Sequence, residues 1–237
     1  MIFGAILAGG VGSRLNISNI PKQFFILGDK PIIIHTIEKF LVCERIDCIY
    51  VGIHKDWVCY MNDLLKQYNI DTNKVKLTEG GSDRNLTLLN VINSIESDYG
   101  ESDEHIIVTH DAVRPFVTLR MIEENIDAAI KYGACDTAVA AIDTIVMSKD
   151  SEFISEIPNR KLMYQGQTPQ SFNMSMIKKL YMDLSEEEKA VLTDACKICT
   201  VRNVGVKIVD GDMSNIKVTT VSDYKMAQAM LGGVSVD

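Results

Sequence analysis

The stretch GAILAGGVGSRLNISNIPKQF, residues 4–24, decides the fold of this chain. Its apolar start belongs to a short run, Ile2–Leu7, that predicts a buried β-strand. The strand leads into the glycine-rich loop Ala8–Gly12, and two cations follow, Arg14 and Lys22. Glycines let main-chain N–H groups approach an oxyanion closely, and fixed cations beside them neutralise phosphate charge. The stretch therefore predicts a phosphate-binding loop at the carboxyl end of a first strand, where open α/β sheets bind ligands.

This loop differs from the two common glycine-rich phosphate motifs. A P-loop has the pattern G-x-x-x-x-G-K-[ST], which does not occur in the sequence. The dinucleotide pattern G-x-G-x-x-G begins at Gly10 and Gly12, but Leu15 stands where the third glycine belongs. The second predicted strand ends in His54, and no carboxylate is placed there to bind a ribose 2′-hydroxyl. These features disfavour a Rossmann dehydrogenase, and the structural alternative is a loop that merely turns a strand into a helix.

Composition indicates a soluble globular enzyme. The chain has 237 residues, of which 46% are hydrophobic and 24% charged, and its net charge of −8 argues against nucleic acid as a partner. No apolar stretch approaches the length of a membrane span, and the start lacks a signal-peptide pattern, so we expect a cytoplasmic protein with no membrane partner. The one C-x-x-C motif, Cys196 to Cys199, has no second pair at zinc spacing. We therefore expect the six cysteines to be free thiols.

Strand-like and helix-like segments alternate through the first two thirds of the chain. Strands are predicted at Cys48–Ile53, Lys74–Glu79, Ile106–His110 and Ala134–Ala141, and helices at Ile33–Cys43, Trp57–Tyr68, Asp83–Ile95, Met121–Tyr132 and Met174–Leu184. Such alternation predicts an α/β fold with a mostly parallel, twisted sheet that is flanked by helices on both faces. A closing helix is predicted at Ser222–Leu231, with Ser222 as its N-cap.

The alternation of predicted strands and helices is interrupted between residues 144 and 167. This polar segment holds three short β-favouring runs, Thr144–Met147, Phe153–Ile157 and Leu162–Gln167. We interpret it as a β-arm that projects from the sheet, and because exposed strand edges invite pairing, it is a candidate dimerisation element. An ordinary surface hairpin is the alternative. Residues 1–237 thus form one predicted domain with an arm at 144–167.

Three further groups carry chemistry. Asp111 follows an apolar strand, where its carboxylate could hold Mg²⁺ together with substrate phosphates, or form a structural ion pair with Arg114. The string GGSDRN, residues 80–85, opens a predicted helix; its glycines could let a flat base lie against the backbone, and Ser82 or Asp83 could cap the helix. Lys217 follows a polar turn and is either a further cation of the site or a surface lysine.

Taken together, these blocks resemble one family, the cytidylyltransferases that couple CTP to a sugar-alcohol phosphate, over essentially the whole chain. The match lies in the order LAGGVGSR, PKQF, GGSDRN, HDAVRPF, DT, R-x₇-TPQ, TDA and NIKVTT. The resemblance implies a Rossmann-like nucleotidyltransferase fold. Two branches share the blocks: methylerythritol-phosphate cytidylyltransferases of isoprenoid synthesis, and ribitol-5-phosphate cytidylyltransferases of teichoic-acid and capsule synthesis. The strings THDAVRPF, MYQGQTPQSF, LTDACKI and GGSDRN resemble the ribitol branch.

The resemblance predicts a reaction: transfer of CMP from CTP to D-ribitol 5-phosphate, giving CDP-ribitol and pyrophosphate. The first alternative is 2-C-methyl-D-erythritol 4-phosphate as the acceptor. An alternative of another class is a nucleotide-binding regulatory protein without catalysis. The acceptor phosphate is already ionised at neutral pH, so this chemistry needs no general base, and catalysis is positioning plus charge neutralisation.

The resemblance also implies a role for individual residues. The nucleotide would be held by Leu7, Ala8, Gly9, Gly10, Gly12, Gly81, Ser82 and Thr87. Arg14, Lys22 and Lys217 would be the catalytic cations, and Asp111 would hold Mg²⁺ or another divalent cation. The acceptor would be bound by Arg114, Thr144 and Arg160, the last two reaching from the arm into the partner subunit's site of a homodimer. A ribulose-5-phosphate reductase, which would supply ribitol 5-phosphate, is a candidate partner.

Overall fold

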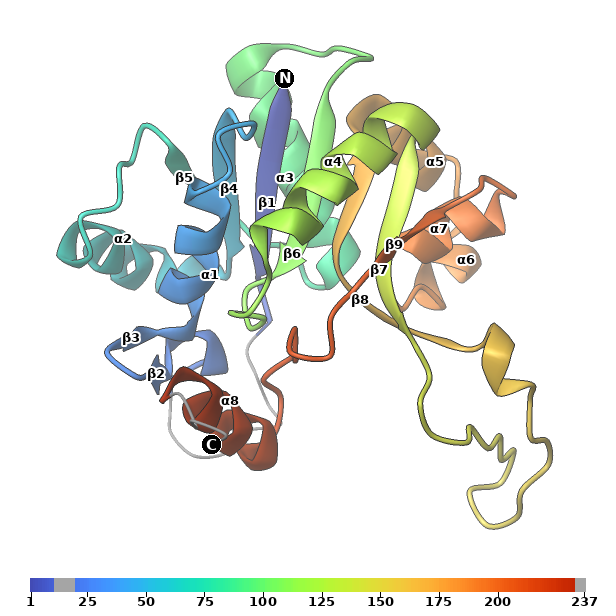
Figure 1. Cartoon of the computed structure of the whole chain (residues 1–237). Helices are drawn as coiled ribbons and strands as arrows, with labels where there is room; N and C mark the ends of the chain where they lie inside the picture. The colour runs from blue at the N-terminus through green and yellow to red at the C-terminus, as the bar shows by residue number, and fades with distance from the viewer. Residues whose placement is uncertain (11–19, 233–237) are drawn as a thin grey trace.

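A computed structural model describes residues 1–10 and 20–232 of the chain, and it has the α/β architecture that the alternation predicts (Figure 1). Within these residues one sheet of seven strands has the order β5-β4-β1-β6-β8-β7-β9. Its strands are β1 (Ile2–Ala8), β4 (Cys48–Ile53), β5 (Val75–Glu79), β6 (Ile106–Asp111), β7 (Ala134–Ala140), β8 (Tyr164–Asn173) and β9 (Lys207–Asp210). Strand β8 runs antiparallel to both of its neighbours, and the other pairings of the sheet are parallel.

Helices cover both faces of the sheet (Figure 1). They are α1 (Ile32–Leu41), α2 (Val58–Gln67), α3 (Arg84–Tyr99), α4 (Leu119–Tyr132), α5 (Met174–Met182), α6 (Glu186–Ala190), α7 (Cys196–Val201) and α8 (Val221–Leu231). One core cluster joins the sheet to α1, α2 and α4, and a second joins the opposite face to α3, α5 and α7. None of these helices is long and apolar enough to cross a membrane.

The inner strands β1, β4 and β6 carry apolar side chains on both faces. For this reason each of them appears in the sequence as an apolar run that predicts a strand. Along β1, Ile6 and Ala8 belong to the first core, whereas Phe3, Ala5 and Leu7 belong to the second. Side chains alternate across a strand, and a parallel strand covered on both faces reads as a continuous apolar run. The predicted strands and helices named above therefore lie within a few residues of the observed ones. All six cysteines are free, as expected.

A third, smaller core lies beside the sheet. It joins a hairpin of β2 (Ile26–Leu27) and β3 (Lys30–Pro31) to α8, and its buried members are Phe25, Leu27, Ile32, Val113, Val218 and Ala227. A short 3₁₀-helix, Lys22–Phe24, leads into the hairpin. The segments that carry Lys22 and Lys217 are thus anchored on one common body.

Two expectations need correction. The arm projects from the sheet as predicted (Figure 1), but its first two β-favouring runs form no strand in the described structure beyond an isolated bridge between Met147 and Glu156. The Asp150 carboxylate accepts hydrogen bonds from the N–H groups of residues 152 and 153, which fixes a turn between the two runs. The N-cap of α8 is Thr220 rather than Ser222, because Thr220 and Asp223 satisfy each other's N–H groups in a capping box.

Candidate active site

Two loops meet where β1 and β5 end, and Thr87 of α3 is bonded to the second loop and lies against Gly9 of the first. Its hydroxyl accepts a hydrogen bond from the N–H of Gly81 at 3.0 Å and donates one to the carbonyl of Asp83 at 2.7 Å. A Cβ added at Gly9 would lie 2.7 Å from the same oxygen, so the glycine loop can only take this position without a side chain there. Thr87 is buried, and its hydroxyl serves the protein's own backbone.

The start of α3 forms one wall of the site. Asp83 is the N-cap, since its side chain accepts hydrogen bonds from the N–H groups of Asn85 and Leu86, each at 2.9 Å. This decides between the two capping residues that the sequence left open. Ser82 is exposed and donates to the Asp83 carboxylate at 3.3 Å. Its hydroxyl therefore lies at the rim of the site rather than in the helix cap.

Asp111, at the end of β6, is surrounded by three cations. Its Oδ2 lies 2.9 Å from Nζ of Lys217 and 3.2 Å from Nε of Arg114, and its Oδ1 lies 3.4 Å from Nε of Arg84. Burial raises the pKa of Asp111, but Arg84, Lys217 and Arg114 outweigh burial and hold the pKa far below its usual range. Three positive charges thus meet one negative charge, and the surplus suits a polyanionic ligand. The Asp111–Arg114 ion pair exists, but as one part of this larger cluster.

Lys22 lines the same hollow as Lys217 and Asp111. The neighbouring Gln23 is 2% exposed, and its amide donates to the carbonyls of Ala8 at 3.0 Å and Gly10 at 3.4 Å. Gln23 thereby fixes the path of the glycine loop. The sequence analysis did not assign it a role, although an amide directly after Lys22 in the block PKQF was a usable signal.

Asn215, which the sequence analysis also missed, anchors the segment that carries Lys217. The side chain is fully buried and donates to the carbonyl of Thr168 at 2.8 Å. The backbone carbonyl of Asn215 accepts a hydrogen bond from Nη1 of Arg114 at 2.7 Å. Lys217 is therefore held at the site and is not a free surface lysine.

Two small adjoining hollows, of about 130 and about 140 Å³, open at this edge of the sheet, and both are lined by Leu7, Gly10 and Asp111. They bring together ten of the predicted site residues: Leu7, Ala8, Gly9, Gly10, Lys22, Gly81, Ser82, Thr87, Asp111 and Lys217. Arg114 lies beside them, buried against Asp111. Gly12 and Arg14 lie outside the described residues.

The structure does not bring the arm residues into this site. Thr144 and Arg160 lie on the projecting arm, where Arg160 donates to the carbonyl of Ile142 at 2.6 Å. Neither residue lines the two hollows.

The donor set is compatible with a magnesium ion that takes most of its ligands from a nucleotide. No group of three or more His, Cys, Asp or Glu side chains in the described part of the chain could hold a metal by itself. Mg²⁺ is commonly bound by one or two carboxylates together with substrate phosphates. Asp111 is the carboxylate that lies where the two hollows meet.

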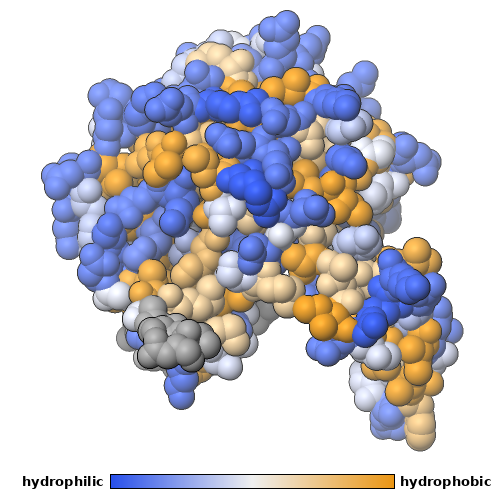
Figure 2. Space-filling model, in the orientation of Figure 1, coloured by the Kyte–Doolittle hydropathy of each residue, from blue (hydrophilic) through white to orange (hydrophobic). Residues whose placement is uncertain are grey.

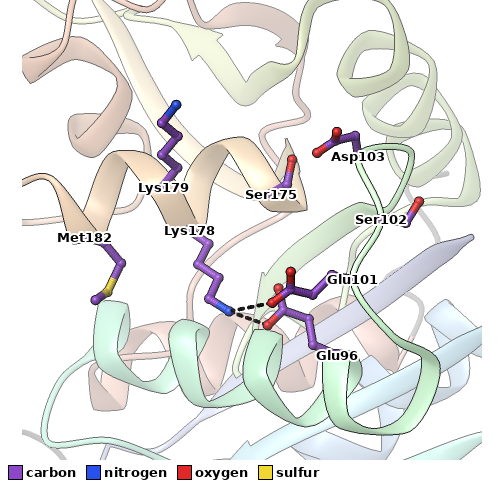
Figure 3. A pocket seen from close by; sticks show the side chains of 8 residues that line it. All are labelled: Glu96, Glu101, Ser102, Asp103, Ser175, Lys178, Lys179 and Met182. Atoms are coloured by element: carbon purple, nitrogen blue, oxygen red, sulfur yellow. Dashed lines mark hydrogen bonds and ion pairs between the residues drawn. The ribbon is translucent and has the colours of Figure 1, made fainter.

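Another hollow, shown in Figure 3, lies near the opposite end of β6, between α3 and α5. Lys178 points at two carboxylates there, forming ion pairs with Glu96 and, at 3.9 Å, with Glu101. Carboxylates outnumber lysines in the lining, so this hollow offers no surplus of positive charge for a phosphate. The glycine loop and the cations around Asp111 therefore mark the better candidate site.

Comparison with known proteins agrees with this geometry. Residues 2–233 match the family model of 2-C-methyl-D-erythritol 4-phosphate cytidylyltransferase, IspD. The crystal structure of 4-diphosphocytidyl-2C-methyl-D-erythritol synthase from Anaerococcus prevotii is 28% identical, with a TM-score of 0.80 over 98% of this chain and 96% of that one. The Francisella tularensis 2-C-methyl-D-erythritol 4-phosphate cytidylyltransferase is 26% identical, with a TM-score of 0.77 over 95% and 97% of the two chains. The chain therefore belongs to the IspD family of cytidylyltransferases.

Proposed function

We propose that this protein transfers CMP from CTP to a phosphorylated polyol, releasing pyrophosphate. The observation that carries the proposal is the cluster of Lys217, Arg84 and Arg114 around Asp111, directly beside the glycine loop. A triphosphate needs such a surplus of positive charge together with backbone N–H groups. Membership in a cytidylyltransferase family supports CTP as the nucleotide.

The reaction brings two anions together, and the site's residues lower that electrostatic barrier. An oxygen of the acceptor phosphate attacks the α-phosphorus of CTP, and the bond from that phosphorus to the pyrophosphate oxygen breaks in line. Lys22 and Lys217 neutralise charge at the reacting phosphates, a task that the resemblance also gives to Arg14. The loop at Gly10 orients the nucleotide, and a magnesium ion held by Asp111 would supply further positive charge when bound. No residue needs to accept a proton, because the acceptor is already ionised.

For the acceptor we propose D-ribitol 5-phosphate, on the resemblance of four sequence strings to the ribitol branch. The comparisons favour 2-C-methyl-D-erythritol 4-phosphate instead, because the matched family model and the Anaerococcus and Francisella proteins carry that name. The two branches share the ordered blocks, so a match to the family model is expected of either. CDP-ribitol would serve teichoic-acid or capsule synthesis, with a ribulose-5-phosphate reductase supplying the acceptor.

We also propose a homodimer that forms through the arm. Apolar side chains gather on the arm (Figure 2), where Phe153, Ile157 and Leu162 are 72%, 60% and 70% exposed. An apolar surface of this kind on a projecting segment is typical of an interaction site. In such a dimer Thr144 and Arg160 would reach the acceptor phosphate in the partner subunit's site.

The test is a pyrophosphate-release assay with CTP, Mg²⁺ and each of the two acceptors in turn. We expect turnover with ribitol 5-phosphate. Turnover with methylerythritol phosphate alone would overturn the acceptor, and tight CTP binding without turnover would support the non-catalytic alternative. Lys22→Ala should lower turnover by orders of magnitude, whereas Lys39→Ala, on the exposed side of α1, should leave it unchanged.

A further inference from the structure

A second polar cluster shares Arg84 with the cations around Asp111, and its other two members have no role in the reaction described above. It consists of Arg84 at the start of α3, Asp136 of β7 and Gln170 of β8. Asp136 and Gln170 are partners in the register of β7 and β8. Arg84 joins this pair to the site, because its Nε donates to Oδ1 of Asp111 at 3.4 Å.

The backbone places the cluster on the face of the sheet that α3 covers. Side chains two positions apart in a strand share a face. Ala134 lies two positions before Asp136, Phe172 lies two positions after Gln170, and both belong to the core cluster under α3, α5 and α7. Arg84, which begins α3, therefore faces Asp136 and Gln170 rather than the opposite layer.

Several polar atoms of this cluster are buried without a hydrogen-bond partner among the residues that the structure describes. They are Nη1 and Nη2 of Arg84, Oδ1 of Asp136 and Oε1 of Gln170, and the Gln170 side chain is only 2% exposed. Each buried polar group left unpaired costs about 1–3 kcal/mol, so such a set in one place points to a missing partner. The atoms comprise donors on the arginine and acceptors on the other two side chains. A hydroxyl group, which both donates and accepts, complements such a set.

We infer that Arg84, Asp136 and Gln170 bind hydroxyl groups of the acceptor polyol, and that they help to determine which polyol phosphate is used. This inference rests on the proposed function. Asp136 is partly accessible, and beside it stands Gly166, where even a Cβ would lie 3.4 Å from Oδ2. The lack of a side chain at Gly166 leaves room for a ligand to approach the carboxylate.

The ionisation of Asp136 suits this role. Burial raises its pKa to about 6, and Asp194 acts in the same direction, while the Gln170 amide, Arg84 and Arg114 act against them. The carboxylate is therefore largely ionised at neutral pH and can accept hydrogen bonds from two hydroxyl groups.

The cluster favours the more hydroxylated acceptor. Ribitol 5-phosphate is unbranched and carries one more hydroxyl than methylerythritol phosphate, which has a methyl branch. A site built to hydrogen-bond hydroxyl groups rejects a ligand that leaves its buried polar atoms unpaired. Loss of one charged partner should therefore weaken the binding of ribitol phosphate more than the binding of methylerythritol phosphate.

The test uses Asp136→Asn, which keeps the shape of the side chain, and Gln170→Met, which removes the amide at similar volume. In the full-length enzyme we expect the KM for ribitol 5-phosphate to rise about tenfold or more in each variant. The KM for CTP should not rise, and the melting temperature should not fall. Asp63→Asn, which removes an exposed carboxylate on α2, is the matched control and should change neither KM.

Several outcomes would overturn the inference. Unchanged acceptor KM values in both variants would mean that the cluster holds water only. A parallel rise in the KM values for CTP and acceptor would mean that the cluster supports the nucleotide site as a whole. If the unaltered enzyme releases no pyrophosphate with either polyol phosphate, the proposed function fails and this inference falls with it; an active enzyme with unaffected variants removes this inference alone.

Discussion

Asp111 illustrates how one carboxylate organises cations for a ligand that carries the opposite charge. Without it, Lys217, Arg84 and Arg114 would repel one another across a few ångströms. With it, the three side chains are held in fixed places, and positive charge remains to be matched by phosphate. The three side chains therefore need less rearrangement when a polyanion binds, because folding has already placed them.

The first prediction concerns Lys217. Replacing it by alanine removes the cation that lies 2.9 Å from Asp111 at the mouth of the site, and we expect kcat/KM to fall on the order of a hundredfold. Lys225→Ala, on the exposed surface of α8, is the control for loss of one positive charge. Steady-state pyrophosphate release measures both, and equal rates for the two variants would remove Lys217 from the reaction.

The second prediction concerns the stability of Asp136→Asn. Burial raises the pKa of Asp136 from 3.8 to about 6, so between these values the folded protein keeps a proton that the unfolded chain has lost. The free energy of unfolding of the natural protein therefore decreases as pH rises through this window. Asparagine has no charge to bury, so the variant should be more stable at pH 7.5 by about 2 to 3 kcal/mol, and the difference should vanish near pH 4. Urea unfolding across this range measures it, and a constant difference at all pH values would contradict the account.

At the scale of elements, the close approach of α3 to the sheet depends on small residues beneath it. A Cβ at Gly52 of β4 would lie 2.5 Å from Cγ2 of Thr87, and a Cβ at Gly9 would meet the hydroxyl of the same side chain. Thr87 thus fills the space that two glycines leave. Gly9, Gly81 and Thr87 also line one of the two hollows of the candidate site, so this packing lies directly at that hollow.

The third prediction tests that packing. Gly52→Ala forces α3 away from β4 and should lower the free energy of unfolding by about 1–3 kcal/mol. Thr87→Ser removes the methyl group that the new Cβ would strike and keeps the hydroxyl for Gly81. In a double-mutant cycle the two changes together should cost less than their sum by at least about 0.5 kcal/mol. Strict additivity would show that this contact does not limit the approach of α3.

Elements whose side chains are uniformly apolar and buried can be predicted from the sequence. Elements that combine buried and exposed, or buried and polar, side chains are harder to predict. Strand β4 is buried along its whole length, and its bounds, Cys48–Ile53, were predicted without error. The ten residues of β8, YQGQTPQSFN, are mostly polar, and the prediction placed their start in the arm. Buried side chains such as Thr168 and Ser171 find hydrogen-bond partners far away in the sequence, which no local pattern shows. The edge strand β9 (Lys207–Asp210) is mostly exposed and lacks the pattern for the same kind of reason.

The residues of the candidate site also fall into two groups, those that the sequence predicts and those that only the folded structure shows. Residues of the glycine loop, Asp111 and Lys217 could be named because they stand in short blocks next to predicted strand ends. Asn215 could not, and for Gln23 only its place after Lys22 was a signal, because the role of both side chains depends on the distant carbonyls that they reach. The cluster at Asp136 needs the register of β7 against β8, and register is a property of the folded sheet.

At the scale of the whole molecule, the arm is a segment that does not contribute to the hydrophobic core clusters of the main body. Its apolar side chains are exposed, and its polar turn is held by the Asp150 carboxylate and by the hydrogen bonds between Met147 and Glu156. The main body has a core on each face of the sheet and does not need the arm for its packing. In the proposed dimer, a second copy would cover these exposed apolar side chains.

The fourth prediction follows from this arrangement. Phe153→Glu together with Leu162→Glu should convert the proposed dimer into monomers and lower turnover, because Thr144 and Arg160 would no longer reach a partner's site. Ile130→Glu introduces the same charge at an exposed apolar position on α4 and should leave the dimer intact. Sedimentation velocity measures the mass, and a natural protein that sediments as a monomer would contradict the proposal.

The small core at α8 has a consequence for how the enzyme comes into being. The hydroxyl of Tyr224 donates a hydrogen bond to the carbonyl of Ile26, 198 positions away in the chain. The segments bearing Lys22 and Lys217 are both anchored on that core, so neither lysine takes its final place until α8 has docked. This core needs residues from both ends of the described chain, so it can form only after α8 has been synthesised. If the proposed function holds, a chain truncated before Lys217 would carry the glycine loop without that cation or its anchoring core, and we expect it not to turn over CTP.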